Sequence, residues 1–239
     1  MNMNKYTSGD RWNIPGIKLI YGEVVADTWG KVTYDPLFNE TETERYVSIL
    51  GRELSLYPAG YLIKAGISKI VLGRNLAFDS EYRGAVPDPY RKVLYLSVNG
   101  SYGERDETYL VHVLHHELHH MVEYAVWKNM YFEWAEWNKL NPGRFSYGRG
   151  GTGYAETEPD YYSVTHPLNG FLNLYSMTGG EEDRCELAAF IMSDKERPKL
   201  LKFFVSDLIL QRKIQFITGF INNFAGEMFI DIEKFLRKT

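Results

Sequence analysis

The stretch from residue 115 to residue 120 reads His115-His116-Glu117-Leu118-His119-His120, and it decides how the rest of the chain is interpreted. It contains the spacing H-E-x-x-H as His116, Glu117 and His120. On a helix, at about 100° per residue, His116 and His120 lie about 40° apart and can close on one ion. Glu117 is one step further round, so it flanks the ion instead of ligating it. Such a carboxylate can take a proton from the water that a zinc ion activates, which is what a hydrolytic zinc site needs.

Apolar residues around this motif recur every three or four positions, which predicts an amphipathic helix that starts near Asp106. The apolar stripe consists of Leu110, Val113, Leu114, Leu118, Met121, Val122 and Ala125. The pairs His112/His116 and His115/His119 have the same i, i+4 spacing, but neither first histidine is followed by a carboxylate. These pairs could bind metal without performing hydrolysis. The alternative to any metal site is a histidine-rich surface helix, or histidines hydrogen-bonded in a core.

The composition is ordinary for a globular enzyme, with 239 residues of which 44% are hydrophobic and 24% charged. A net charge of -4 without any basic block gives no reason to expect nucleic acid or an anionic membrane as a partner. The single cysteine, Cys185, rules out an internal disulfide and a cysteine-rich zinc site, so histidine and carboxylate must hold the metal. The sequence shows neither a signal peptide nor a membrane span, which makes a cytoplasmic protein the default expectation unless a leader was removed.

The residues before the motif predict a small lobe with a mixed sheet. We expect strands at 17–21, 31–34, 69–72 and 92–98, a helix at 41–56 and a loop at 83–89. The strand at 92–98 directly precedes the active helix, which suggests a sheet edge where an extended peptide could add as an antiparallel strand. Its apolar residues on both faces equally allow an inner strand.

After the motif the pattern predicts mainly helices. We expect helices at 131–140 and 181–193, a further one opened by Pro198, and one at 214–236 with a break at Ala225-Gly226. The irregular stretch 141–180 should border a cleft. Its glycine-rich run, 148–153, lacks the lysine and the preceding strand of a phosphate loop, so phosphate binding is not expected.

The third metal ligand is not supplied by the motif helix. A metzincin continues H-E-x-x-H-x-x-G-x-x-H, but Glu123 and Val126 occupy the glycine and histidine positions here. The best candidates are Glu182 and Glu186, which share one helical face, so that one could ligate zinc while the other orients an imidazole. Other carboxylates remain open as the third ligand, namely Glu123, Glu133, Glu136, Glu156, Glu158 and Glu181.

H-E-x-x-H on one helix, E-x-x-x-E on a second and Tyr175 seven residues before Glu182 resemble the gluzincin metallopeptidases. The resemblance is to the catalytic domain of anthrax lethal factor and to a bacterial "putative zinc-binding metallopeptidase" group. It implies that Glu182 ligates zinc, that Glu186 supports the ligands without touching the metal, and that Tyr175 donates to the transition-state oxyanion. Arg184 and Cys185 stand where lethal factor relatives carry alanine and an aromatic residue, so specificity cannot be transferred from the toxins.

The resemblance implies an α+β, zincin-like fold in a single catalytic domain over 1–239. An N-terminal α/β lobe with the active-site helix would span 1–127, and a helical lobe with the third-ligand helix would span 128–239. We expect a monomeric zinc metalloendopeptidase that acts on a peptide or protein, with Glu117 as general base. His166 is either a second oxyanion donor or a surface residue. The alternatives are a zinc-stabilised, non-catalytic binding module and a zinc hydrolase of non-peptide amides.

Overall fold

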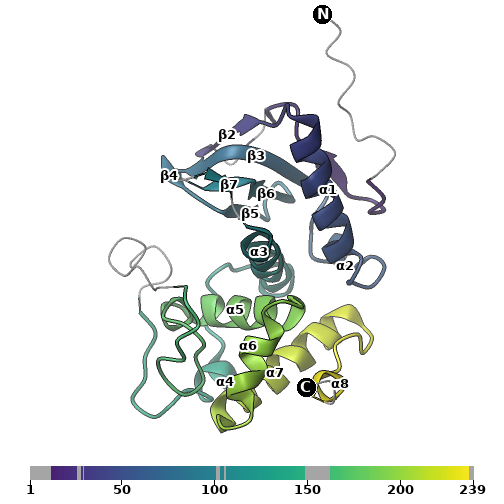
Figure 1. Cartoon of the computed structure of the whole chain (residues 1–239). Helices are drawn as coiled ribbons and strands as arrows, with labels where there is room; N and C mark the ends of the chain where they lie inside the picture. The colour runs from purple at the N-terminus through teal and green to yellow at the C-terminus, as the bar shows by residue number, and fades with distance from the viewer. Residues whose placement is uncertain are drawn as a thin grey trace, which may run out of the picture. The chain divides into compact units, whose positions relative to one another are not determined.

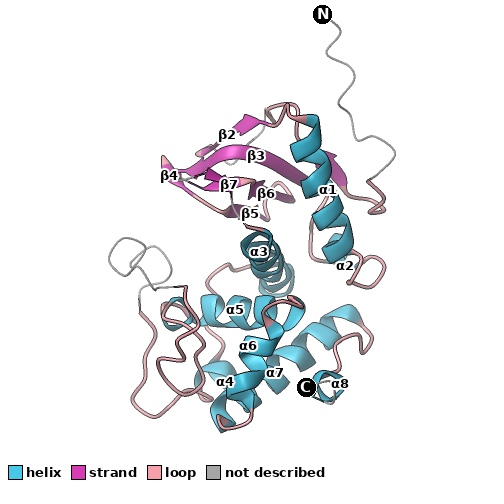
Figure 2. Ribbon diagram, viewed as in Figure 1, coloured by secondary structure: helices cyan, strands magenta, loops and turns pink. Residues whose placement is uncertain are grey.

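Figure 1 shows a computed structural model of the chain, which describes residues 12–25, 28, 30–100, 103–104, 106–148 and 162–236. The chain divides into two compact units, Met1–Val126 and Trp127–Thr239. The described strands of the main sheet belong to the first unit, whereas the second unit is built mainly from helices (Figure 2). The fold is therefore α+β with a mixed sheet, as the sequence predicted.

The first unit is organised around one long strand, β3. The strands of its sheet are β1 (Lys18–Ile20), β2 (Val32–Pro36), β3 (Lys69–Phe78), β4 (Glu81–Tyr82), β5 (Ala85–Asp88) and β6 (Val93–Ser97). The order is β1-β3-β6-β5, with β1 and β6 parallel to the first part of β3. Strands β2 and β4 pair antiparallel with the later part of β3. A separate two-stranded ribbon follows, formed by β7 (Asn99–Gly100) and β8 (Gly103–Glu104).

Strand β6 is an inner strand, so the predicted sheet edge at 92–98 is wrong. It pairs with β3 on one side and with β5 on the other, and all five of its residues are buried. The residues Val93 and Tyr95 point to one face and Leu94 and Leu96 to the other, and both faces are covered. Apolar side chains on both faces are typical of a strand inside a covered sheet.

Strand β5 replaces the loop expected at 83–89, which is a second correction. Pro87 and the nearby glycine suggested a loop, but a proline is tolerated in an edge strand where its missing N–H faces away from the partner strand. The amide of Ser97 donates to the carbonyl oxygen of Gly84, 2.8 Å away, so Gly84 and then every second residue face β6. The nitrogen of Pro87 therefore points to the open side of β5, where the structure describes no further strand.

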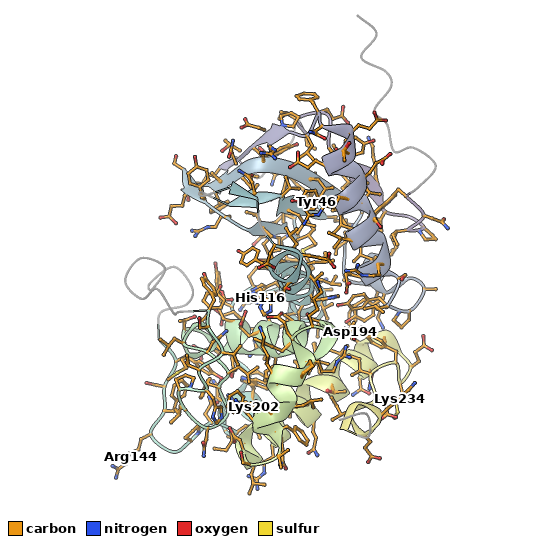
Figure 3. The ribbon with its side chains drawn as sticks, in the orientation of Figure 1. Tyr46, His116, Arg144, Asp194, Lys202 and Lys234 are labelled. Carbon is orange, nitrogen blue, oxygen red and sulfur yellow. The ribbon has the colours of Figure 1, made fainter. Side chains whose placement is uncertain are left out.

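Helix α1 (Glu40–Leu54) and the single turn α2 (Tyr61–Lys64) also belong to this unit. Asn39 caps α1 by accepting a hydrogen bond of 3.0 Å from the amide of Glu42. Tyr46 on the buried face of α1 donates to the carbonyl oxygen of Val98, 2.8 Å away, and so fixes the helix to the end of β6 (Figure 3).

The second unit is a helical assembly around a buried helix. Its helices are α4 (Ala135–Asn138), η2 (Tyr175–Met177), α5 (Gly180–Met192), α6 (Arg197–Phe204), α7 (Leu208–Ala225) and α8 (Ile232–Leu236). Helix α5 packs against η2, α6 and α7, and all of its residues from Asp183 to Met192 are buried. Helix α7 begins earlier than the expected residue 214, and Gly226 ends it with φ of 84°, which confirms the predicted break.

The expected helix at 131–140 is reduced to the single turn α4. Trp134 has an extended backbone, and the carbonyl oxygen of Phe132 accepts a hydrogen bond of 3.0 Å from Arg184. That carbonyl is thereby used by a side chain instead of a helical turn. The described parts of 141–179 contain only η2 and a Leu168–Phe171 bridge as regular structure, and α5 begins at Gly180. The run 149–153 and the carboxylates Glu156 and Glu158 lie outside the described residues.

None of the helices that the structure describes is both long and apolar enough to cross a lipid bilayer.

Candidate active site

The motif residues lie on α3 (Glu107–Trp127), a helix of 21 residues. Its predicted start is confirmed, because the carboxylate of Asp106 accepts a hydrogen bond of 2.9 Å from the amide of Tyr109. Four histidines of this helix are buried, namely His115, His116, His119 and His120. They are therefore not the exposed side chains of a histidine-rich surface helix.

His116 and His120 face one another on α3. Their Nε2 atoms are 3.2 Å apart, and their rings meet edge to face with centroids 4.9 Å apart. Two imidazole nitrogens bound to one tetrahedral zinc, each at about 2.0–2.1 Å, would be separated by about 3.3 Å. The pair therefore fits a zinc ion without a change of side-chain rotamer, although a single N–H···N hydrogen bond would have the same length.

Glu117 differs from its neighbours because its side chain is only half-buried. It follows His116 by one residue and precedes His120 by three, which places it beside the imidazole pair. His112 is also half-buried, and one of its ring nitrogens lies within 4.8 Å of a ring nitrogen of His116. Partial exposure leaves the Glu117 carboxylate within reach of water, as a general base requires.

His119 has a carboxylate partner of its own. Its Nε2 atom lies 3.5 Å from Oε1 of Glu123, one turn further along α3, and both side chains are almost fully buried. Glu123 was one of the open candidates for the third metal ligand. Its pairing with His119 argues for a role in holding α3 together instead.

His115 belongs to a buried polar chain that the sequence analysis did not predict. Its Nδ1 atom lies 2.8 Å from the hydroxyl of Tyr57, and its Nε2 atom lies 3.1 Å from Oε2 of Glu53. Burial raises the pKa of Glu53, but hydrogen bonds from His115 and Arg52 outweigh it, so the net pKa is lowered. Arg52 also donates to Glu107 at the start of α3, 2.9 Å away. Helices α1 and α3 are thus linked through charged groups in the first unit.

The predicted residues of the second unit gather on α5 and the turn before it. Glu182 is half-buried, whereas Glu186 is buried and its Oε2 atom accepts a hydrogen bond of 2.6 Å from Asn173. The same Asn173 accepts a hydrogen bond from the amide of Ser176 through its Oδ1 atom. Ser176 lies in η2 next to Tyr175, so Asn173 connects the turn that carries Tyr175 to α5.

Asp183, between these glutamates, is the centre of a buried network. Its Oδ2 atom accepts hydrogen bonds from Lys213 (2.7 Å), Tyr147 (2.7 Å) and the indole N–H of Trp137 (3.1 Å). Burial raises the pKa of Asp183 even against the attraction of Lys213. Burial likewise lowers the pKa of Lys213, whose ammonium also donates to the carbonyl oxygen of Gly170.

Arg184 is also fully buried, in a setting of aromatic rings. Its guanidinium lies 5.7–6.0 Å from the ring centroids of Trp127, Trp134 and Trp137. These contacts hold the Arg184 charge inside the packing of the second unit.

His166 has a partner that favours a structural role over oxyanion binding. Its Nε2 atom lies 2.9 Å from Oδ2 of Asp207, and its ring stacks on Phe203 with centroids 4.4 Å apart. Asp207 also caps α7 through the amides of Ile209 and Leu210. Backbone and His166 hydrogen bonds lower the pKa of Asp207 although burial raises it.

Two sequence signals could have revealed the networks that the prediction missed. Lys213 falls on the apolar stripe of α7 with Leu210, Ile214 and Ile217, so it had to be buried and needed an acidic partner. Glu53 falls in the same way beside Leu50 on the inward face of α1. In each case the sequence marks the buried charge but not its partner.

No family model matches this chain, and no curated protein sequence matches it either. A crystal structure described as a "putative zinc-binding metallo-peptidase" from Bacteroides caccae has the same fold. The TM-score is 0.57, over 92% of this chain and 82% of that chain, with 14% sequence identity. The fold is zincin-like. At this identity the likeness establishes the architecture, and the chemistry must be argued from the residues of this chain.

Proposed function

We propose that this chain is a zinc metalloendopeptidase of the gluzincin type. His116 and His120 supply two ligands, and Glu182 supplies the third. The observation that carries the proposal is the 3.2 Å separation of the two Nε2 atoms on α3, with the half-buried Glu117 beside them. Two histidines and one glutamate leave a coordination position open, as catalytic zinc sites do, whereas structural sites are closed.

Bound zinc would supply a Lewis acid that polarises the scissile carbonyl and makes water a stronger nucleophile. Glu117 takes the proton from the attacking water and passes it to the leaving amine. The phenol of Tyr175 donates a hydrogen bond to the carbonyl oxygen as negative charge develops there, a contribution of about 3 kcal/mol for one such donor. Hydrolysis of a peptide bond then needs no covalent enzyme intermediate.

Glu186 holds the site in position without touching the metal. Asn173 fixes one of its carboxylate oxygens, and we assign the other to the free N–H of a ligating imidazole. Partners of this kind set the tautomer and the orientation of metal-bound histidines. Asn173 also accepts a hydrogen bond from the backbone of the turn that carries Tyr175. One amide side chain therefore positions both Glu186, assigned to orient a ligating imidazole, and Tyr175, assigned to the developing oxyanion.

Strand β5 is the part of the sheet where an extended substrate could add, since β6 is an inner strand. Its open side presents the N–H and C=O of Ala85 but only the C=O of Pro87. A substrate strand could therefore receive one hydrogen bond from β5 and donate up to two. We propose a peptide or protein substrate, handled by a monomer.

Metal content and hydrolysis, measured on the same preparation, test the proposal. The purified chain should bind one zinc ion, cleave members of a peptide library, and lose cleavage with a chelator. Glu117→Gln should keep its zinc while cleavage falls by several orders of magnitude, whereas the exposed Glu227→Gln should change neither property.

The possible failures are distinct. Loss of zinc in Glu117→Gln would make this residue a ligand and refute the assignment. Full zinc loading without cleavage of any peptide would refute the peptidase and leave the binding module. Hydrolysis of other amides but not of peptides would favour the amide hydrolase.

A further inference from the structure

A hollow of about 500 Å³ lies in the second unit, between α6 and residues 162–164. Tyr162, Val164 and Phe203 give it apolar walls, and Ser163, Lys199, Lys202 and Glu196 add polar groups. The hollow is thus amphipathic. It suits a ligand with an apolar stem and a polar end better than a small inorganic ion.

The hollow has one cation without an acidic neighbour. Lys199 lies 3.8 Å from Glu196, so its charge is partly compensated. Lys202, labelled on α6 in Figure 3, is exposed, and its Nζ atom lies 5.6 Å from the ring centroid of Phe203. None of the carboxylates that the structure describes lies within ion-pair distance of Lys202. The hollow therefore favours an anionic group at the Lys202 end.

The walls of the hollow are held by contacts outside it. Phe203 is stacked on His166, which Asp207 fixes in turn. On the opposite wall the ring of Tyr162 lies 4.9 Å from the ring of Tyr175, centroid to centroid. Tyr162 thus touches both the hollow and the residue assigned to the reacting carbonyl, so a peptide bound at Tyr175 could place a nearby side chain here.

We propose that this hollow is a substrate subsite for an acidic side chain, glutamate above all. The inference rests on the proposed peptidase function. The methylene groups of a substrate glutamate would lie against Tyr162 and Phe203, and its carboxylate would pair with Lys202 and accept from Ser163. A free phosphate would gain nothing from the apolar walls and would meet only one uncompensated cation.

A kinetic experiment tests the subsite in the zinc-loaded protein. Peptides that differ only in Glu, Gln or Lys are varied one position at a time around the cleaved bond, and kcat/KM is measured. At one position Glu should exceed Gln by about 2- to 5-fold, the range for a partly exposed ion pair. Lys202→Met should abolish this preference and Lys202→Glu should reverse it in favour of Lys. The exposed Lys195→Met, outside the hollow, should leave it intact.

A binding experiment separates this inference from the peptidase proposal. The Glu117→Gln protein is titrated with the Glu peptide, and amide resonances of Ser163 and Lys202 are followed by NMR. They should shift with the Glu peptide and much less with the Gln peptide or with inorganic phosphate. If the unsubstituted protein cleaves no peptide, shifts of this pattern would keep the binding site and reject the peptidase. An acidic preference that survives Lys202→Glu, or equal shifts with phosphate, would overturn the subsite.

Discussion

Replacing Lys213 by methionine should destabilise the second unit strongly. The side chains of Lys213 and Asp183 are both 0% exposed, with Nζ and Oδ2 2.7 Å apart. Removing one partner of such a pair costs about 3–5 kcal/mol, because a charge is left buried without compensation. Asp183 would still accept hydrogen bonds from Tyr147 and Trp137, and methionine keeps most of the aliphatic volume. We therefore expect the free energy of unfolding to fall by an amount near the lower limit, about 3 kcal/mol.

The loss of stability caused by Lys213→Met should depend on pH in a defined direction. Burial already raises the pKa of Asp183, and without the ammonium of Lys213 it should rise further. A carboxyl group whose folded pKa lies above its unfolded value favours the folded state in acid, and this contribution is lost as pH rises through the folded pKa. The deficit of Lys213→Met should thus be largest near neutral pH and should shrink toward pH 4.

Thermal unfolding followed by tryptophan fluorescence measures both effects, since Trp137 belongs to the network. For a chain of this size, about 3 kcal/mol corresponds to a Tm lower by about 6–12 °C. The exposed Lys234→Met is a matched control and should change stability by less than about 0.5 kcal/mol. The reasoning would be refuted if the free energy of unfolding of Lys213→Met stayed within about 1 kcal/mol of that of the unsubstituted chain at pH 7. It would also be refuted if the loss of stability grew in acid.

Three further predictions concern the metal ligands, the buried acid of α1 and the sheet. Glu182→Ala should weaken zinc affinity far more than Glu186→Ala, whose loss should be about 10- to 100-fold, and equal retention would move the third ligand elsewhere. The lowered pKa of Glu53 means that it stabilises the fold above its ordinary pKa of 4.5 and loses this effect as pH falls through the folded pKa. The stability difference to Glu53→Gln, measured by urea unfolding, should therefore shrink in acid. Gly73→Ala would place Cβ 2.6 Å from the ring of Tyr34 and should cost about 1–3 kcal/mol, visible in the same assay.

Local patterns in the sequence determined the elements whose residues repeat strongly. The helix α3, the cap at Asp106 and the break at Gly226 were all predicted, because helix periodicity and capping act between residues close in the chain. The buried face of α3 was predicted only in part, since Leu110, Val113 and Ala125 are half-buried whereas His116 and His120 are buried. The pairing of His116 with His120 has the same origin, since one helical turn separates them. The zincin-like architecture came from motif resemblance, and the solved structure from Bacteroides caccae agrees with it.

Local patterns failed where a distant segment decided the outcome. β5 formed at the expected loop because β6 offers it a pairing edge, and Pro87 tolerates this only with its nitrogen turned outward. The predicted helix at 131–140 was shortened because Arg184 takes the carbonyl oxygen of Phe132.

The sequence by itself determined which residues can carry the chemistry, since H-E-x-x-H fixes its own geometry on a helix. Only the tertiary structure decided which buried charges meet. Lys213 finds Asp183 thirty residues away, and His115 finds Glu53 across 62. The physical reason is that a buried charge must be compensated, but any oppositely charged residue brought close by the fold can compensate it.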